Sequence, residues 1–277
     1  MKKRTRYLAN HNRIEIIVTY ECNRQCYNCE AQVRQAPSKE KITVEQIENF
    51  IAESIENSKK WEHIRILGGE PTLHKDINKI MKVLVEYKNN YSKETIITLV
   101  TNGYGDYVNK IKDELEVNYD IKIENSNKTS DIQSHFSPIN QAPIDMVEYK
   151  NEDFTKGCWI TTICGIALDL HGYYPCSASA AADRVLRFGL GMKKFPLAED
   201  SLSNSFTPFC SRCGHYYNEI NDIAEFETAD MGKVEELEHL INSNQKRIGE
   251  KMNLTEEIIS PVWKKALKEW REENSYN

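Results

Sequence analysis

The chain has 277 residues, and its 36 Lys and Arg against 42 Asp and Glu give a net charge of −6. A mildly acidic chain with a mean hydropathy of −0.62 is a poor match for general binding to nucleic acid or to anionic membranes. No apolar run approaches the roughly 18 residues of a transmembrane helix, and polar residues follow the basic start where a signal peptide would be apolar. We therefore predict a cytoplasmic protein whose eight cysteines are reduced thiols, metal ligands or catalytic groups.

The first half of the chain alternates strand-like and helix-like segments. Short runs rich in β-branched residues predict strands, and apolar residues at helical spacing predict the helices between them. Thr43 with Gln46 forms a capping-box pattern that marks the start of the first helix. Such alternation indicates βα units and a parallel sheet, with the functional loops after the strands. The expected strands are 14–19, 64–67, 95–100 and 119–123, and the expected helices lie around 43–55, 77–87 and 108–115.

The second half differs in character, and we predict a domain boundary near residue 150, where the secondary-structure signal is weak. The following segment, 151–225, holds five cysteines and an expected hairpin at His171-Gly172. A domain this small usually needs cross-links or metal to be stable. The remainder, 226–277, is expected to be helical, and Ser260-Pro261 is a good N-cap and first residue for its last helix.

Three cysteines lie close together after the first expected strand. Cys22, Cys26 and Cys29 have C-x3-C-x2-C spacing, so one short polar loop can fold its thiols around a single centre. A closed structural zinc site needs four ligands, whereas soft thiolates suit an iron–sulfur cluster, and a [4Fe–4S] cube on three cysteines keeps one iron open. The alternative is three unrelated loop thiols, which fits poorly because cysteines are rarely placed so densely on polar surface.

This motif resembles that of the radical S-adenosylmethionine (radical SAM) superfamily. The resemblance implies a partial (β/α)6 TIM-type barrel over residues 1–150, with a [4Fe–4S] cluster on the three cysteines and SAM bound at the open iron. It further implies reductive cleavage of SAM to a 5′-deoxyadenosyl radical that abstracts hydrogen from a substrate. A reducing partner such as flavodoxin or ferredoxin would supply the electron. One departure is that Asn28 stands where the family usually has an aromatic residue.

Motifs after the later strands fit the same resemblance. Gly68-Gly69-Glu70 follows the second expected strand, where the family carries its GGE motif, although alone it would indicate only an ordinary turn. The glycines allow close backbone approach to a ligand, and Glu70 can accept a hydrogen bond from the SAM ammonium group. The other expected cofactor contacts are Tyr27, against the adenine, Asn102, in Thr101-Asn102-Gly103, and Ser126, which with Asn125 and Lys128 is alternatively part of a solvated loop.

The remaining cysteines indicate a second metal centre. Cys210 and Cys213 form a C-x2-C pair, a strong metal signal in a reduced protein. The stretch from Gly172 to Cys176 resembles the hairpin of SPASM and twitch domains, with one residue fewer than usual between Gly and Cys. That resemblance implies a small α+β twitch-like domain with one auxiliary [4Fe–4S] cluster on Cys158, Cys176, Cys210 and Cys213. Two alternatives stay open, a structural zinc site and Cys164 in place of Cys158.

Cys164 is the one cysteine left over by this division. It is either a small buried apolar residue or a hydrogen-atom donor to the substrate radical, which would make the reaction an epimerisation. Without a donor, the radical would instead be oxidised, with the auxiliary cluster as electron acceptor.

We therefore expect a radical SAM oxidoreductase or epimerase that acts on a polar small molecule, such as a sugar, nucleotide sugar or aminocyclitol. One alternative is modification of a ribosomally made peptide or activation of a partner protein. The lack of an evident leader-binding extension before the first strand disfavours it. A further alternative is a non-catalytic iron–sulfur scaffold or regulatory protein.

Overall fold

The computed structural model describes residues 6–133, 136–217 and 257–274, and its centre is one sheet with the strand order β4-β3-β2-β1-β5-β6. All neighbouring strands are parallel except β5 and β6, which form an antiparallel hairpin. The strands are β1 (Arg13–Thr19), β2 (His63–Gly68), β3 (Ile96–Thr101), β4 (Lys122–Asn125), β5 (Ile166–Asp169) and β6 (Gly172–Tyr174).

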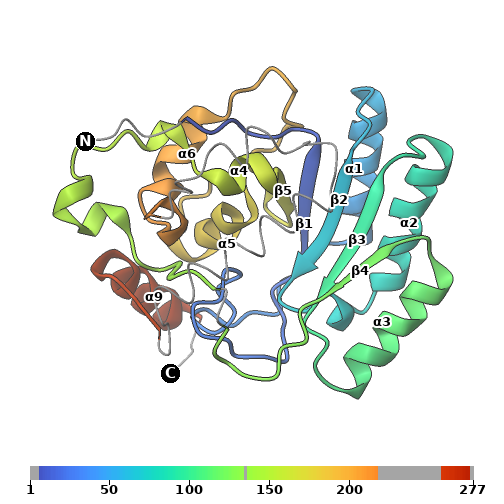
Figure 1. Cartoon of the computed structure of the whole chain (residues 1–277), viewed down its shortest axis with the longest axis horizontal. Coiled ribbons are helices and arrows are strands. Elements are labelled where there is room, and N and C mark those ends of the chain that lie inside the picture. The colour runs from blue at the N-terminus through green and yellow to red at the C-terminus, as the bar shows by residue number, and fades with distance from the viewer. Residues whose placement is uncertain (1–5, 134–135, 218–256, 275–277) are drawn as a thin grey trace.

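The helices lie on both sides of this sheet. Figure 1 shows α1, α2 and α3 along the outer side of β1 to β4, with α4, α5, α6 and α9 on the other side of β1. The fold is thus a mixed α/β arrangement dominated by parallel strands, as the alternating pattern predicted. The α-helices are α1 (Val44–Glu56), α2 (Ile77–Asn90), α3 (Asp106–Asn118), α4 (Trp159–Ile163), α5 (Ser177–Leu186), α6 (Ser203–Cys210) and α9 (Pro261–Glu273). Short 3-10 helices lie at Pro71–Leu73, Pro143–Asp145, Val147–Tyr149, Phe154–Lys156 and Gly214–Tyr217.

The main hydrophobic core lies between the sheet and helices α1 and α2. Side chains alternate between the two faces of a strand, so Ile14, Ile16 and Val18 of β1 all point into this core, where they pack with Phe50 and Leu84 of the helices. The residues between them point to the opposite face of the sheet, where the candidate site lies.

The predicted start of α1 is confirmed in detail. The Thr43 hydroxyl accepts a hydrogen bond from the Gln46 backbone N–H at 3.1 Å, and the Gln46 side chain accepts one from the Thr43 N–H at 2.9 Å. We expect Thr43→Ala to lower the free energy of unfolding by about 1 kcal/mol, because the Gln46 backbone N–H in the first turn loses its partner. Urea denaturation measures this loss, with Glu48→Ala at an exposed position of the same helix as the control. Equal losses in the two variants would contradict a capping role.

One expected strand is displaced along the chain. The segment 119–123 was predicted as a strand, but β4 begins only at Lys122. Tyr119 instead ends α3, because its N–H donates to the Leu115 carbonyl at 3.0 Å and its hydroxyl donates to the Asn78 carbonyl at 3.0 Å. The segment that favoured a strand here, Tyr-Asp-Ile-Lys-Ile, therefore begins with a helix cap, and the strand follows it.

The cysteine-rich segment continues the same sheet as the first half of the chain. β5 pairs in parallel with β1, with Ile14 opposite Ile166 and Glu15 opposite Ala167. The hairpin predicted at His171-Gly172 is confirmed, and Gly172 adopts a φ of 132° in its turn. The predicted boundary near residue 150 thus falls in an irregular segment between β4 and β5, two strands of one sheet.

The C-terminal helix closes the side of the molecule away from α1 and α2. Ser260 is the N-cap of α9 and Pro261 is its first residue, as predicted. Trp263, Leu267 and Trp270 are buried in a second core with residues of α5. Of the segment predicted as helical, 226–277, residues 226–256 lie outside the described residues. Within the described part of the chain, each helix is too short or too polar to cross a bilayer.

Candidate active site

The face of the sheet opposite the main core lines a cavity of about 200 Å³. The alternation of side chains explains which residues reach it. Glu15 and Ile17 of β1 lie between the core-facing isoleucines and line the cavity, as do Arg65 and Leu67 of β2. Later strands contribute Val100, at the end of β3, and Glu124, in β4.

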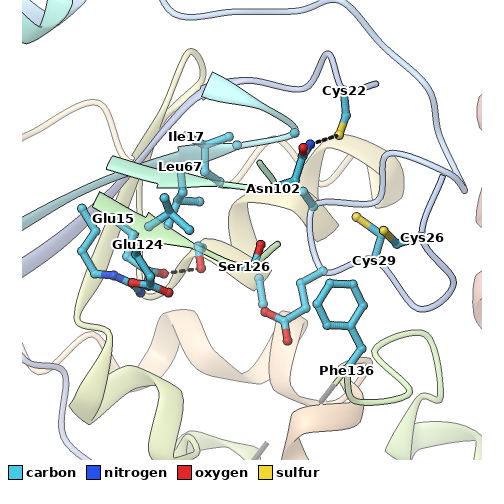
Figure 2. A pocket seen from close by; sticks show the side chains of 18 of the residues that line it. Glu15, Ile17, Cys22, Cys26, Cys29, Leu67, Asn102, Glu124, Ser126 and Phe136 are labelled. Carbon is cyan, nitrogen blue, oxygen red and sulfur yellow. Dashed lines mark hydrogen bonds and ion pairs between the residues drawn. The ribbon is translucent and has the colours of Figure 1, made fainter. Parts of the chain in front are cut away.

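The three cysteines of the first motif line one end of this cavity. Cys22, Cys26 and Cys29 all border it, and Figure 2 shows their sulfur atoms on the side opposite Glu15 and Glu124. Burial raises the pKa of the Cys22 thiol to about 12 and also raises that of Cys29. Because iron is bound by thiolates, binding a cluster here must displace protons from these thiols. The donor set and its convergence on one cavity fit a [4Fe–4S] cluster on three cysteines.

The Gly-Gly loop after β2 packs directly against the cysteine loop. The Gly69 N–H donates to the Thr19 carbonyl at 2.7 Å, and the Glu70 N–H donates to the Glu21 carbonyl at 2.8 Å. A Cβ at Gly69 would lie 2.3 Å from the Glu21 carbonyl oxygen and 3.0 Å from the Cys22 Cβ. Only glycine allows this approach, so the loop that carries Cys22 and the loop after β2 form one wall of the cavity.

Two further predicted cofactor contacts, Asn102 and Ser126, also line the cavity. The Asn102 side-chain amide points at the Cys22 sulfur at 3.6 Å and donates to Asn23 Oδ1 at 2.9 Å. The Ser126 hydroxyl donates to the Thr101 carbonyl at 3.0 Å, which fixes it to the end of β3. The structure therefore brings Gly68, Gly69, Asn102 and Ser126 together with the three thiols.

Glu70 and Tyr27 are not among the residues that line this cavity. Glu70 is fully buried, and its carboxylate accepts from the Thr72 and Thr101 hydroxyls, both at 2.8 Å, and from the Asn102 N–H at 2.8 Å. It thereby ties the loop after β2 to the loop after β3, outside the cavity lining. Tyr27 is covered by the Arg34 guanidinium, 4.0 Å from its ring centre. Direct contacts of Glu70 and Tyr27 with SAM stay predictions.

The second group of cysteines surrounds a separate, smaller cavity of about 20 Å³. Cys158, Cys176, Cys210 and Cys213 all line it, together with His215. Cys158 is the N-cap of α4, Cys176 is the N-cap of α5, and Cys210 is the last residue of α6. Burial and the nearby Cys158 raise the pKa of Cys176 to about 12. The four thiols thus line one cavity from three helix ends, and an auxiliary cluster on them stays a prediction.

Cys164 is separated from these four thiols and lines the first cavity. The single turn of α4 lies between Cys158 and Cys164 and places the two thiols toward different cavities. Burial and the nearby Glu15 carboxylate raise the pKa of Cys164 well above its usual value, so this thiol keeps its proton. All eight cysteines are free thiols, and in the described parts of the chain no three Cys, His, Asp or Glu side chains are grouped closely enough to hold a single metal ion.

Sequence reasoning missed a charged group at the far end of the first cavity. Arg65 forms ion pairs with Glu15 and, at 2.7 Å, with Glu124, and the Ser177 hydroxyl donates to Glu15. Burial raises the pKa of Glu15 above its usual value, and the ion pair with Arg65 offsets only part of this shift. Burial disfavours the charged form of Arg65, but Glu124 and Glu15 outweigh it and raise its pKa. The available signal was a charge between two isoleucines in each of β1 and β2, whereas β4, with the sequence Lys-Ile-Glu-Asn, is mostly polar.

Comparison with known proteins connects this geometry to a family. Residues 16–142 match the family profile of the Radical SAM superfamily. The chain is 31% identical over 119 residues to the GTP 3′,8-cyclase of Aliarcobacter butzleri, an alignment that covers 42% of this chain and 35% of that enzyme. It is 36% identical over 115 residues to a protein of Methanocaldococcus jannaschii that is provisionally named a glycyl-radical enzyme activating enzyme, with 40% of each chain covered. The matched region thus spans less than half the length of these curated relatives.

A solved structure also resembles the chain loosely. The crystal structure of BtrN in complex with AdoMet and 2-DOIA aligns over 88% of this chain and 89% of that chain, with 11% identity and a TM-score of 0.39. A similarity this loose supports no conclusion about individual residues. The family profile and the curated relatives support a radical SAM superfamily domain, for which a [4Fe–4S] cluster and SAM are the implied cofactors.

Proposed function

We propose that this chain is a radical SAM enzyme that removes a hydrogen atom from a carbinol carbon of a polar small molecule, as an oxidoreductase or epimerase. One observation carries the proposal. Cys22, Cys26 and Cys29 line the same cavity as Cys164 and the Glu15–Arg65–Glu124 group. The cysteine loop, a further thiol and a charged group thus border one cavity.

The residues of this chain would hold the cofactors as follows. Cys22, Cys26 and Cys29 would bind one [4Fe–4S] cluster, and Gly69 would let the backbone approach SAM. When bound, these cofactors supply a radical that abstracts hydrogen, and the protein orients and shields it. The Asn102 amide beside the Cys22 sulfur would stabilise that thiolate.

The second cavity would hold an auxiliary [4Fe–4S] cluster in a twitch-like segment. Its four thiols, Cys158, Cys176, Cys210 and Cys213, come from separate helix ends, and the cavity they line has almost no polar surface. Cys164 keeps its proton and borders the first cavity, so it would be the hydrogen-atom donor if the reaction is an epimerisation. We further propose that flavodoxin or ferredoxin supplies the electrons. A cytoplasmic location is part of the proposal, because eight free thiols suit a reducing compartment.

The test is reductive cleavage of SAM by the reconstituted, reduced protein in deuterated water. We expect 5′-deoxyadenosine to form faster with a substrate chosen among sugars, nucleotide sugars and aminocyclitols than without one. A carbonyl product would identify a dehydrogenase, because the substrate radical has then lost an electron and a proton. Solvent deuterium at the reacting carbon would identify an epimerase, because the Cys164 thiol proton exchanges with water. Protein that binds SAM but never yields 5′-deoxyadenosine would point to a non-catalytic scaffold.

Activation of a partner protein is the second candidate. The observation that favours it is the similarity to the provisionally named glycyl-radical enzyme activating enzyme. If this candidate holds, a partner protein and not a small molecule will stimulate cleavage of SAM. A glycyl-radical signal in the electron paramagnetic resonance spectrum of that partner would then appear, without any small-molecule product.

A further inference from the structure

The far end of the first cavity, built from Glu15, Arg65 and Glu124, has an unusual charge balance and is called the acid end below. Arg65 lies between the two carboxylates and pairs with both. This leaves the group with one negative charge in excess. Figure 2 shows Glu15 and Glu124 across the cavity from the cysteines, with Ser126 between the two ends.

The other charged side chains that line the cavity lie near the cysteines and are already engaged. Lys128 lies over the Phe136 ring, with its Nζ 4.7 Å from the ring centre. The Arg24 backbone N–H bonds the Cys22 sulfur, and its guanidinium pairs with Asp131 at 2.9 Å. Glu30 follows Cys29 directly and pairs with His215 at 3.0 Å. Arg65 is therefore the sole positively charged side chain among the described lining residues at the acid end.

The next cation along β1 lies behind this group. Arg13 is 1% exposed and donates to His63 at 2.7 Å, and it does not line the cavity. Glu15 lies on the same face of the strand two residues closer to the cavity, so its carboxylate stands between Arg13 and a bound molecule. A ligand at the acid end would meet carboxylate oxygens first.

The two carboxylates differ in what they can offer to a ligand. Both Glu15 oxygens are engaged, one by Arg65 and one by the Ser177 hydroxyl, and the side chain is only 4% exposed. Glu124 is 34% exposed and is bonded to Arg65 through Oε2. A carboxylate oxygen accepts more than one hydrogen bond, so Glu124 is the better-placed acceptor for a group entering the cavity.

We propose that the substrate is a small polyol that carries a protonated amine, and that this ammonium group binds Glu124 at the acid end of the cavity. The inference rests on the proposed function and narrows its substrate class. An ammonium group has three donors and no acceptor, so it matches an acceptor-rich site with excess negative charge. A phosphate or diphosphate there would be repelled by the same charge, which disfavours a nucleotide sugar. Cys164 lines the same cavity as Glu124, so a polyol bound at Glu124 would share that cavity with this thiol.

Calorimetric titration of the holoprotein, with both clusters and SAM but no reductant, tests this without turnover. Three cyclitols serve as ligands: scyllo-inosamine, scyllo-inositol and myo-inositol 1-phosphate. The first two differ by one ammonium in place of one hydroxyl. We expect scyllo-inosamine to bind about tenfold more tightly than scyllo-inositol, since a charged hydrogen bond replaces a neutral one. The phosphate should bind most weakly.

Substitution of the acid end identifies the contact. Glu124→Gln keeps an oxygen for Arg65 but removes the excess charge, and it should abolish the preference for scyllo-inosamine while SAM affinity stays unchanged. Glu114→Gln, at a solvent-facing position of α3 where Glu114 pairs with Lys110 at 3.9 Å, is the matched control and should keep the preference.

Three outcomes would overturn the inference: tighter binding of the phosphate, a preference that survives Glu124→Gln, or no binding of scyllo-inosamine at millimolar concentration. If 5′-deoxyadenosine still forms with another class of substrate, the inference about the amine is wrong and the proposed function stands. If reduced holoprotein forms no 5′-deoxyadenosine with any candidate, the proposed function itself fails.

Discussion

Replacing Cys29 with alanine is expected to abolish 5′-deoxyadenosine formation and to lower the iron content from about eight to about four atoms per chain. Cys29 is one of only three thiols on the first cavity's cysteine loop, so its loss leaves two protein ligands for a cluster that needs three. The fold should survive, because the Cys29 side chain is only partly buried and lies on a loop. Iron and sulfide analysis, with chromatographic detection of 5′-deoxyadenosine, measures both effects.

The control for this variant is Cys164→Ala, which removes a thiol from the same cavity without touching the loop. It should keep about eight irons per chain and should still cleave SAM. Unchanged iron content in Cys29→Ala would contradict the assignment of the first cluster, because Cys29 would then be dispensable as a ligand.

Replacing Cys176 with alanine is expected to remove the auxiliary cluster while the SAM-binding cluster remains. Iron should again fall to about four atoms per chain, but dithionite-reduced protein should still form 5′-deoxyadenosine. Conversion of substrate should be lost if the product is a carbonyl, because the substrate radical would have no electron acceptor. The separate spectra of the two clusters in electron paramagnetic resonance distinguish this variant from Cys29→Ala.

The same measurement decides between Cys158 and Cys164. The structure places Cys158 with Cys176 around the second cavity and places Cys164 at the first, so Cys158→Ala should lose the auxiliary cluster and Cys164→Ala should keep it. The reverse result would show that the ligand set uses Cys164, and that the thiols rearrange when the cluster is inserted.

Local sequence patterns were sufficient to predict most strands of the sheet and the position of the cysteine loop. The strands before Cys22 and Gly68 are short β-branched runs, and the loops that follow them are held together by backbone bonds such as Gly69 to Thr19. Such features depend on neighbouring residues, so spacing predicts them. The continuation of the sheet into β5 depends on pairing between residues more than 150 positions apart, such as Ile14 and Ile166, and no local pattern contains that information.

The acid end of the cavity shows why part of the site was missed. Glu15 and Arg65 lie in strands whose other residues are mostly apolar, and Glu124 lies in a strand that also carries Lys122 and Asn125. A charge in a strand is usually taken to mark its solvent side. Here that side faces the first cavity, to whose lining the cysteine-rich segment contributes Ile160, Cys164, Ser177 and Ala178. The partners of each charge come from other strands, so their pairing became apparent only when the strand order was known.

The position of Glu70 has a similar explanation. A Gly-Gly-Glu sequence predicts a turn with an acidic side chain, but it does not say which way the carboxylate points. The hydroxyls of Thr72 and Thr101 donate hydrogen bonds to the Glu70 carboxylate and hold it inside the protein. Thr101 lies 31 residues along the chain, and its approach depends on the pairing of β2 with β3.

The first turn of α5 borders both cavities at once. Cys176 faces the second cavity, Ser177 faces the first, and Ala178 borders the two. One inserted residue would rotate everything after it by about 100° around the helix axis, so each of these side chains would exchange its cavity for its neighbour's. Insertions and deletions in this stretch should therefore be rare among homologous chains. Length variation should instead accumulate in exposed connections such as residues 197–201.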